Sequence, residues 1–104
     1  MYFLMRCTHR ENADEARDAL RPAHREWNRS GANGLVSVIT GSALWTDEGV
    51  ALGHWGVIEA ASMADARTYI EGDPFVTGGV VTGIELTRMA DGFAADRINP
   101  RLTV

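Results

Sequence analysis

The residues most able to carry out chemistry are one histidine and one aspartate. His24 lies in the segment RPAHREW, and Asp73 lies between Gly72 and Pro74 in the segment GDPF. An imidazole exchanges a proton near neutral pH, and a carboxylate within hydrogen-bond reach fixes its tautomer and raises its basicity. If the fold brings the two side chains together, they predict a general acid–base pair. Taken alone, GDPF fits equally an aspartate that caps a short turn with Pro74 in its first position.

His24 stands on a predicted helix, one step from the apolar side. Arg17, Arg21 and Asn28 share its flank at helical spacing, which places His24 at the border between core and solvent, where a cleft would have its rim. A lone helical histidine at such a border also fits a purely structural role. The end of the second predicted helix can lie near the first in this order of elements, which would allow His24 and Asp73 to contact each other.

The other two histidines are not expected to be functional. His9 falls in a predicted polar loop and is expected to be solvated, whereas His54 lies on a predicted strand and is expected to be packed or hydrogen-bonded. The sequence contains no paired cysteines, no H-x-x-x-H, no acidic triplet at ligand spacing, no phosphate-binding glycine motif and no G-x-S-x-G. We therefore expect neither a metal nor an organic cofactor, and no nucleophilic serine.

Composition narrows the class of protein. The 104 residues carry a net charge of −4, which argues against a nucleic-acid footprint. The single cysteine, Cys7, cannot form an internal disulfide and is expected to be a buried structural thiol in a cytoplasmic protein. The apolar run around it is too short for a signal peptide or a membrane span. We expect a cytoplasmic single-domain protein that binds neither nucleic acid nor membrane.

The elements that must position these side chains follow from hydrophobic periodicity. Ala13, Ala16, Leu20, Ala23 and Trp27 form one apolar stripe on the first helix, with Asn12 as its expected N-cap, Gly31 as its stop and Pro22 as a kink or fresh start. The second helix begins after Ser62, with Met63, Ala66 and Ile70 facing inward, and residues 73–79 are expected to form a loop. Strands are predicted at residues 2–8, 35–40, 50–59 and 80–89.

This order of elements, β-α-β-β-α-β, predicts a ferredoxin-like α+β fold, with a four-stranded antiparallel sheet and both helices on one face. The other face then carries too many apolar side chains to stay wet, and pairing two sheets would bury them. We therefore predict a homodimer. The side chains assigned to this second face are Phe3, Val36, Val38, Trp55, Val57 and Ile84. The domain is expected to span residues 1–90, and residues 91–104 to form a lid or a strap across the partner subunit.

The segments RPAHREW, TGSAL and IEGDPF together resemble the YCII family, small dimeric α+β barrel proteins of the same broad fold as muconolactone isomerases and antibiotic-biosynthesis-type monooxygenases. The resemblance covers residues 1 to about 89. It places Arg21, Pro22, His24, Gly41, Gly53, Asp73, Pro74 and Phe75 on positions of the family pattern. One departure is Ser42, which stands where the family commonly has a proline.

The resemblance implies proton-transfer chemistry without an organic cofactor, since characterised relatives include a dehydrochlorinase acting on a chlorinated hydroxyquinol. His24 would be the general base or acid, Asp73 its orienting carboxylate, and Arg21 the anchor for an anionic substrate oxygen. The remaining candidate substrate-binding residues are Trp27, Ser42, Trp55 and Phe75, and Trp45 is an alternative to Trp55 in lining an apolar pocket.

Three functions stay open. The first is a small cofactor-free enzyme for isomerisation, elimination or dehydrohalogenation of a cyclic or aromatic metabolite, a chemistry that a positioned base can promote. The second is a non-catalytic small-molecule-binding or accessory protein, in which His24 and Asp73 serve only structure. The third is a cofactor-independent oxygenase of the same fold, which would place Asn28 and Trp27 around the ligand.

Overall fold

The computed structural model describes residues 1–103 and shows the ferredoxin-like α+β arrangement expected from the sequence. The elements follow one another as β1 (Tyr2–His9), α1 (Asp14–Gly34), β2 (Ser37–Trp45), β3 (Ala51–Glu59), α2 (Met63–Gly72), α3 (Pro74–Thr77), β4 (Val81–Arg88) and a 3-10 turn, η1 (Ala95–Arg97). The strand bounds differ from prediction mainly in β2, which continues through Gly41 and Ser42 instead of ending at residue 40. Residue 104 of the predicted tail lies outside the described residues.

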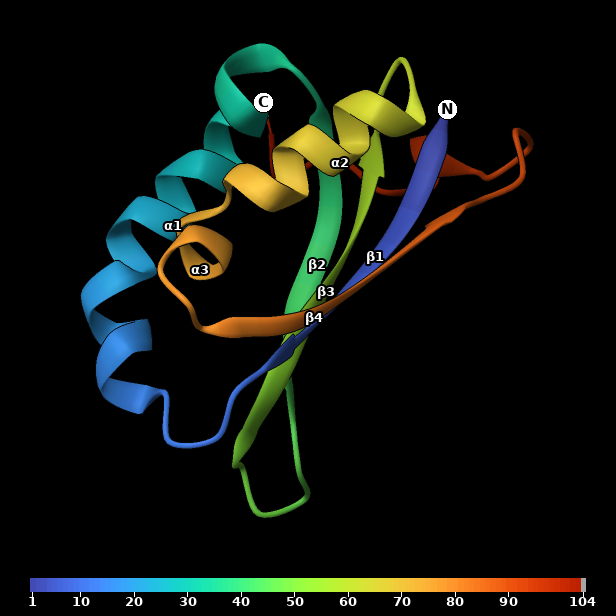
Figure 1. The fold of residues 1–104 in the computed structure, drawn as a ribbon. Coiled ribbons are helices and arrows are strands. Elements are labelled where there is room, and N and C mark those ends of the chain that lie inside the picture. Colours follow the sequence, from blue (N-terminus) through green and yellow to red (C-terminus); the bar gives the residue numbers. More distant parts are fainter. Residues whose placement is uncertain (104) are drawn as a thin grey trace.

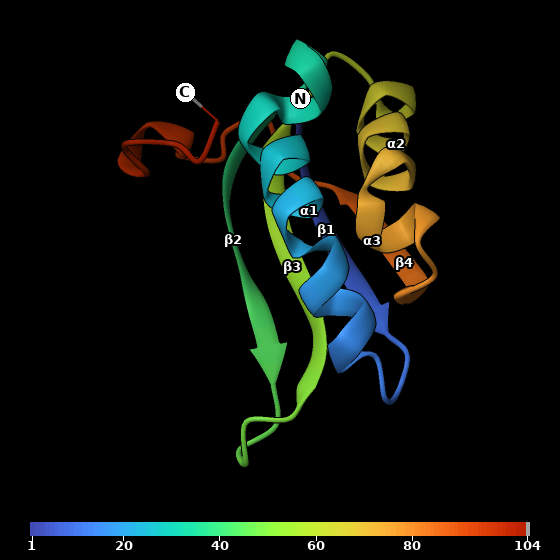
Figure 2. The same ribbon diagram turned by 90° about the vertical axis from the view of Figure 1, so that its left-hand side faces the viewer.

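The four strands form one antiparallel sheet in the order β2-β3-β1-β4. Figure 1 shows α1 and α2 on one side of this sheet, and the segment that follows β4 passing to the other side. In Figure 2, turned by 90°, α1 runs in front of the central strands while α2 and α3 stand beside it toward β4. The sheet is therefore covered by helices on one face only.

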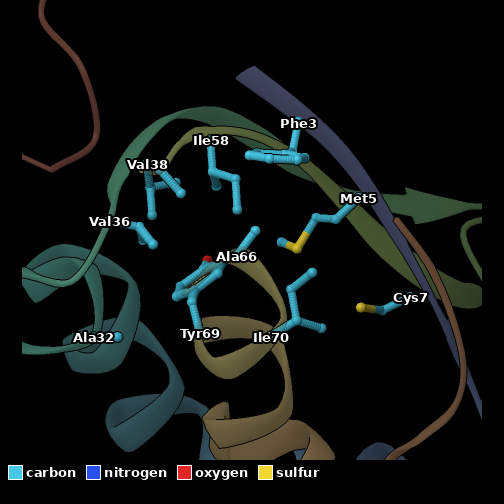
Figure 3. Close-up of a cluster of buried hydrophobic side chains, with 11 residues drawn as sticks. Phe3, Met5, Cys7, Ala32, Val36, Val38, Ile58, Ala66, Tyr69 and Ile70 are labelled. Carbon is cyan, nitrogen blue, oxygen red and sulfur yellow. The ribbon is translucent and has the colours of Figure 1, made fainter. Parts of the chain in front are cut away.

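The main core lies between the sheet and the helices. Phe3, Met5 and Cys7 alternate along β1 with exposed residues, as expected of a strand with one covered face. Figure 3 shows these side chains meeting Tyr69 and Ile70 of α2. Burying each large apolar side chain contributes roughly 1.5–3 kcal/mol, so this cluster is a main source of stability.

The assignment of side chains to the two sheet faces was partly wrong. Phe3, Val36, Val38 and Ile84 belong to the helix-covered core and not to the open face. The strand register explains this. Ile58 of β3 lies opposite Phe3 of β1 on one side and opposite Val38 of β2 on the other, so all three side chains point to the helix-covered face. Only Val57 and Trp55 of the predicted set face away from the helices, where they pack with Ile39.

The chain after β4 folds over the open face of its own sheet. Ala95 is buried against Ile39 and Val57, with Phe93 and Ile98 packed around them. The last described residues then run along the edge of β2, where the N–H groups of Leu102 and Thr103 donate to the carbonyl oxygens of Ile39 and Val38. In the described chain, this segment thus fastens the β2 edge.

Several expectations for α1 were wrong. Asn12 does not cap the helix: it adopts a φ of 56°, and the N-cap position falls on Ala13 without a side-chain cap bond. The helix does not start afresh at Pro22 but continues through it. Ala23, placed in the apolar stripe, is exposed, as is Met63 of α2. Gly31 does end the regular helix, because helical dihedral angles stop there.

The connection from α2 to β4 is more ordered than the loop expected at residues 73–79. Ser62 caps α2 as predicted, accepting a hydrogen bond from the N–H of Asp65. Asp73 then ends α2 and caps the short helix α3, where its Oδ1 accepts from the N–H of Phe75 at 2.9 Å and Pro74 occupies the first turn. The backbone therefore fixes the Asp73 carboxylate before any second partner is considered.

Helices within residues 1–103 are too short or too polar to cross a membrane.

Candidate active site

A cavity of about 370 Å³ lies between α1 and the β2–β3 half of the sheet. Side chains on its sheet wall leave space because five of the lining residues are glycine or alanine: Gly41, Ala43, Ala51, Gly53 and Gly56. Its helix wall is polar, since Arg17, Arg21, His24 and Asn28 recur at spacings of three and four along α1. Chemistry-bearing side chains therefore face a hollow that the sheet leaves unfilled.

The predicted contact between His24 and Asp73 is present. Nδ1 of His24 lies 2.7 Å from Oδ1 and 2.9 Å from Oδ2 of Asp73. The Asp73 side chain is 3% exposed and that of His24 is 14% exposed, so the pair is shielded from water while the imidazole still reaches the cavity. A carboxylate can only accept, so the proton of this bond belongs to Nδ1 of His24.

The opposite nitrogen of His24 has a partner on its own helix. Nε2 lies 3.1 Å from Nδ2 of Asn28, and Oδ1 of Asn28 accepts a short hydrogen bond from the hydroxyl of Tyr69. The Asn28 amide therefore donates to Nε2, which must carry a lone pair. His24 is thus held as the neutral Nδ1–H tautomer, the form that can take up a proton at Nε2.

Phe75 fixes the plane of the His24 ring. The two rings stack with centroids 3.9 Å apart and an interplanar angle of 5°. Because Asp73, which bonds His24, is also the N-cap of α3, the same turn supplies both the carboxylate and the stacking ring. The imidazole therefore cannot tilt without losing one of these contacts.

A second imidazole pair lies beside the first. Nε2 of His9 and Nδ1 of His54 are 2.8 Å apart, and Nδ1 of His9 is 3.4 Å from a guanidinium nitrogen of Arg17. Both rings are buried, which corrects the expectation of a solvated His9 and agrees with a hydrogen-bonded His54. The pKa of each ring is lowered to about 4, chiefly by burial and, for His9, also by the Arg17 charge. Both rings are therefore neutral at pH 7.

The described lining of the cavity has positive charges and no carboxylate. Arg17, Arg21 and Arg25 line it together with the three histidines. Arg21 pairs with Asp18, whose side chain is 74% exposed, so this pair is screened and weak. Arg17 is buried and pairs with the exposed Asp14. In a chain of net charge −4, this cavity favours an anionic ligand.

The other predicted binding residues are divided by the structure. Phe75 lines the cavity, and Trp45, 67% exposed, stands at its mouth. Ser42 and Trp55 border the cavity, but they pair across β2 and β3 at positions whose side chains turn to the open face. The Ser42 hydroxyl donates to the carbonyl of Ala43.

Trp27 does not line the cavity. Its Nε1–H donates to the carbonyl oxygen of Tyr69, and its ring packs where a Cβ on Gly72 would stand. The oxygenase hypothesis placed this ring around the ligand with Asn28, so half of its support is removed.

Three residues of the site were missed or undervalued by sequence reasoning. Tyr69 sits in the buried stripe of α2, where its hydroxyl had no visible partner, and burial raises its pKa. Arg25 follows Arg21 at helical spacing, a signal that was available. His9 was misplaced because β1 extends one residue beyond the predicted strand. Among residues 1–103, no three His, Cys, Asp or Glu side chains are arranged to hold a metal ion.

Residues 1–90 match the YCII-related domain. The chain belongs to the YCII-related family. The match ends at residue 90, just after β4. It therefore includes every residue of the hydrogen-bond network around His24. No curated protein sequence matches this chain.

Solved structures of known proteins show the same fold. One is 5-chloro-2-hydroxyhydroquinone dehydrochlorinase (TftG) from Burkholderia phenoliruptrix AC1100, in complex with 2,5-dihydroxybenzoquinone, which is 22% identical with a TM-score of 0.73 over 88% of this chain and 96% of that one. Another is a putative antibiotic biosynthesis monooxygenase from Nitrosomonas europaea, 8% identical with a TM-score of 0.51 over 89% and 90% of the two chains. The fold is thus that of dimeric α+β barrel proteins.

Proposed function

We propose that this YCII-related protein is a small cofactor-free enzyme in which His24 and Asp73 transfer a proton during isomerisation, elimination or dehydrohalogenation of a cyclic or aromatic metabolite. The observation that carries the proposal is the buried hydrogen bond of 2.7 Å between Nδ1 of His24 and Asp73, at the wall of a cavity. The similar fold of a dehydrochlorinase that binds a dihydroxybenzoquinone supports the choice of substrate class.

In this mechanism His24 acts as the base. Nε2 takes the substrate proton, and the imidazolium that forms is stabilised by the Asp73 carboxylate on its other side. The amide of Asn28 occupies the lone pair of Nε2 in the structure, so the substrate must displace it. Displacement costs one hydrogen bond, which a substrate hydroxyl or acidic C–H group replaces when it reaches Nε2. Catalytic contacts commonly tighten only when the ligand is bound.

The cavity also indicates the charge of the substrate. Arg21 is the best-placed anchor for an anionic oxygen, because its guanidinium lines the cavity three residues from His24 and its ion pair with Asp18 is exposed. A phenolate, enolate or carboxylate would exchange this screened pair for a contact in a partly enclosed site. The exposed Trp45 ring at the mouth offers a flat apolar surface to a cyclic ligand.

A dimer is part of the proposal. The open face of the sheet keeps a groove of about 300 Å³ lined by Leu4, Leu44 and Trp55, and Leu4 is 42% exposed. A second sheet packed against this face would cover these side chains, as in dimeric α+β barrel proteins. The residues that follow residue 90 already occupy the rest of the face, so they would border the partner as a strap.

The decisive experiment compares His24→Ala and Asp73→Asn with the native protein on chlorinated and non-chlorinated hydroxyquinols, following product by absorbance and chloride by ion chromatography. We expect both variants to fold, as judged by circular dichroism, and to lose at least about 10²-fold in kcat/KM. Arg29→Ala is the matched control, because Arg29 lies on the exposed side of α1 in a weak pair with Glu26. Equal turnover by His24→Ala and the control would contradict the proposal.

One observation favours a non-catalytic ligand-binding protein as the second candidate. With Asn28 on Nε2 and Asp73 on Nδ1, both nitrogens of His24 are satisfied without a substrate. In that case aromatic anions would bind the native protein and both variants with similar affinity in calorimetric titrations, and no substrate would turn over.

A further inference from the structure

Among the side chains of residues 1–103, one buried polar atom has no hydrogen-bond partner, and it lies next to the proposed catalytic pair. Nε2 of His54 makes no hydrogen bond within the described residues, although His54 is only 8% exposed. Its nearest charged neighbour is Oδ2 of Asp73, 3.9 Å away. An unsatisfied buried donor is costly, so an imidazole aimed at a carboxylate at this distance calls for an explanation.

The direction of every hydrogen bond leading to His54 can be deduced from Arg17. A guanidinium only donates, so Nδ1 of His9, 3.4 Å from Arg17, must accept. Neutral His9 then carries its proton on Nε2 and donates it to Nδ1 of His54 at 2.8 Å. His54, neutral as well, must carry its own proton on Nε2. The atom that faces Asp73 is therefore an N–H group and not a lone pair.

Asp73 has room for this donor. Its Oδ1 accepts from the N–H of Phe75 and from His24, whereas Oδ2 accepts from His24 alone. Each carboxylate oxygen offers about two acceptor positions, so Oδ2 keeps one free. A separation of 3.9 Å is too long for a hydrogen bond, and closing it requires a shift of about 1 Å.

No other neighbour competes for the His54 N–H group. From β1 it faces His9, whose Nε2 is already a donor, and Cys7, whose thiol is kept protonated because burial raises its pKa to about 12. From α1 the His24 ring lies edge-on with centroids 5.3 Å apart, and Arg17 is itself a donor. From α3 comes the apolar Phe75 ring. Asp73 is the one negatively charged group against it in the described chain.

We propose that His54 is a positioning residue that presents its Nε2–H to Asp73, so that one carboxylate is held between two imidazoles and stays directed at His24. This rests on the proposed function. A carboxylate that accepts hydrogen bonds from both the His24 and the His54 ring cannot rotate away when His24 takes up a proton. Asp73 then remains beside the His24 imidazolium and balances its charge. Arg17 acts at the far end of the chain, where it sets the tautomers of His9 and His54.

The tautomers are tested without any substrate. Two-dimensional ¹H–¹⁵N spectra of the imidazole rings at pH 8 distinguish a protonated nitrogen from an unprotonated one by its nitrogen chemical shift. We expect protons on Nε2 of His54, Nε2 of His9 and Nδ1 of His24. A proton on Nδ1 of His54 would overturn the proposal, because a lone pair would then face the carboxylate.

The positioning role is tested with His54→Gln and His54→Leu. Glutamine can place an N–H donor near the position of Nε2, whereas leucine fills a similar volume without one. We expect His54→Leu to populate the Nε2–H tautomer of His24 measurably and to lower kcat about tenfold with little change in KM, and His54→Gln to restore at least half of both losses.

Failure of this proposal and failure of the proposed function are distinguishable. If the native protein turns over no substrate, the His24 tautomer in the two variants still decides whether His54 positions the pair. If His54→Leu keeps the native His24 spectrum and native kcat, His54 is only a packing residue and the proposal is wrong. Should His54→Leu not fold, the His24 spectrum and kcat of His54→Phe, together with the tautomers of the native protein, decide whether His54 positions Asp73 or only packs.

Discussion

At the scale of single residues, the site depends on keeping three imidazoles within one small volume. Rings of His9 and His54 have centroids 5.0 Å apart, and those of His24 and His54 are 5.3 Å apart. Three charged rings this close would repel one another strongly, so burial keeps His9 and His54 neutral. The third imidazole, that of His24, is the one bonded to the Asp73 carboxylate.

This neutrality predicts how stability depends on pH. The pKa of His9 and that of His54 are lowered from an ordinary value near 6.5 to about 4 in the folded protein. Between these values the unfolded chain binds more protons, so the free energy of unfolding falls as pH falls from about 6.5 to about 4, by up to about 1.4 kcal/mol per pH unit for each ring. Urea unfolding at pH 7.5, 6 and 5 measures the slope.

The control is His9→Gln, which removes one of the two buried titrating rings. It should reduce the slope between pH 6 and 5 without changing the urea m-value. A native slope of zero in this range would contradict the assignment of two buried neutral histidines.

At the scale of elements, the end of α1 is the most constrained turn. Gly31 has a φ of 59°, and a Cβ there would stand 2.0 Å from the carbonyl oxygen of Val36. This close approach turns the chain from the helix into β2, which carries the sheet wall of the cavity. The glycine is therefore required twice, once for its backbone conformation and once for space.

We predict that Gly31→Ala lowers the free energy of unfolding by more than about 2 kcal/mol, because it adds a backbone clash to the left-handed strain. Gly34→Ala is the matched control: its φ is 91°, but a Cβ there meets nothing within 4 Å. It should cost about 1 kcal/mol from strain alone. Thermal and urea unfolding of both variants give the difference, and equal losses would show that the contact with Val36 is unimportant.

At the scale of the whole molecule, the two faces of the sheet differ in how completely they are covered. One is sealed by helices, whereas the other is covered in part by residues after β4 and keeps Leu4 exposed beside the Trp55 groove. Four of the six apolar residues assigned to the open face belong instead to the core beneath the helices. The apolar side chains that a second sheet would cover are those of the groove, Leu4, Leu44 and Trp55.

We predict a homodimer in solution and a monomer for Leu4→Arg, because a long charged side chain in the groove would have to be desolvated between the two sheets, a cost that the nearby Glu85 offsets only in part. Light scattering coupled to size exclusion at several concentrations measures the mass. Leu52→Arg is the control, since Leu52 is also exposed but does not line the groove. A native protein that remains monomeric at high concentration would contradict the prediction.

The sequence by itself predicted the order of elements, the fold class and the pairing of His24 with Asp73. Periodicity is local, so Ala13, Leu20 and Ile70 could be assigned to inward faces, and Asp73 before Pro74 could be recognised as a cap. The family pattern in RPAHREW and IEGDPF then linked His24 to Asp73 across 49 residues.

Only the tertiary structure decided what surrounds that pair. A strand that is one residue longer than predicted placed His9 on the buried face of β1, and the antiparallel register brought His54 opposite Cys7, next to Asp73. Because side chains alternate between the faces of a sheet, such one-residue differences decide which groups meet. The physical reason is that register and the partners of buried polar groups depend on contacts between distant segments, which no local pattern records.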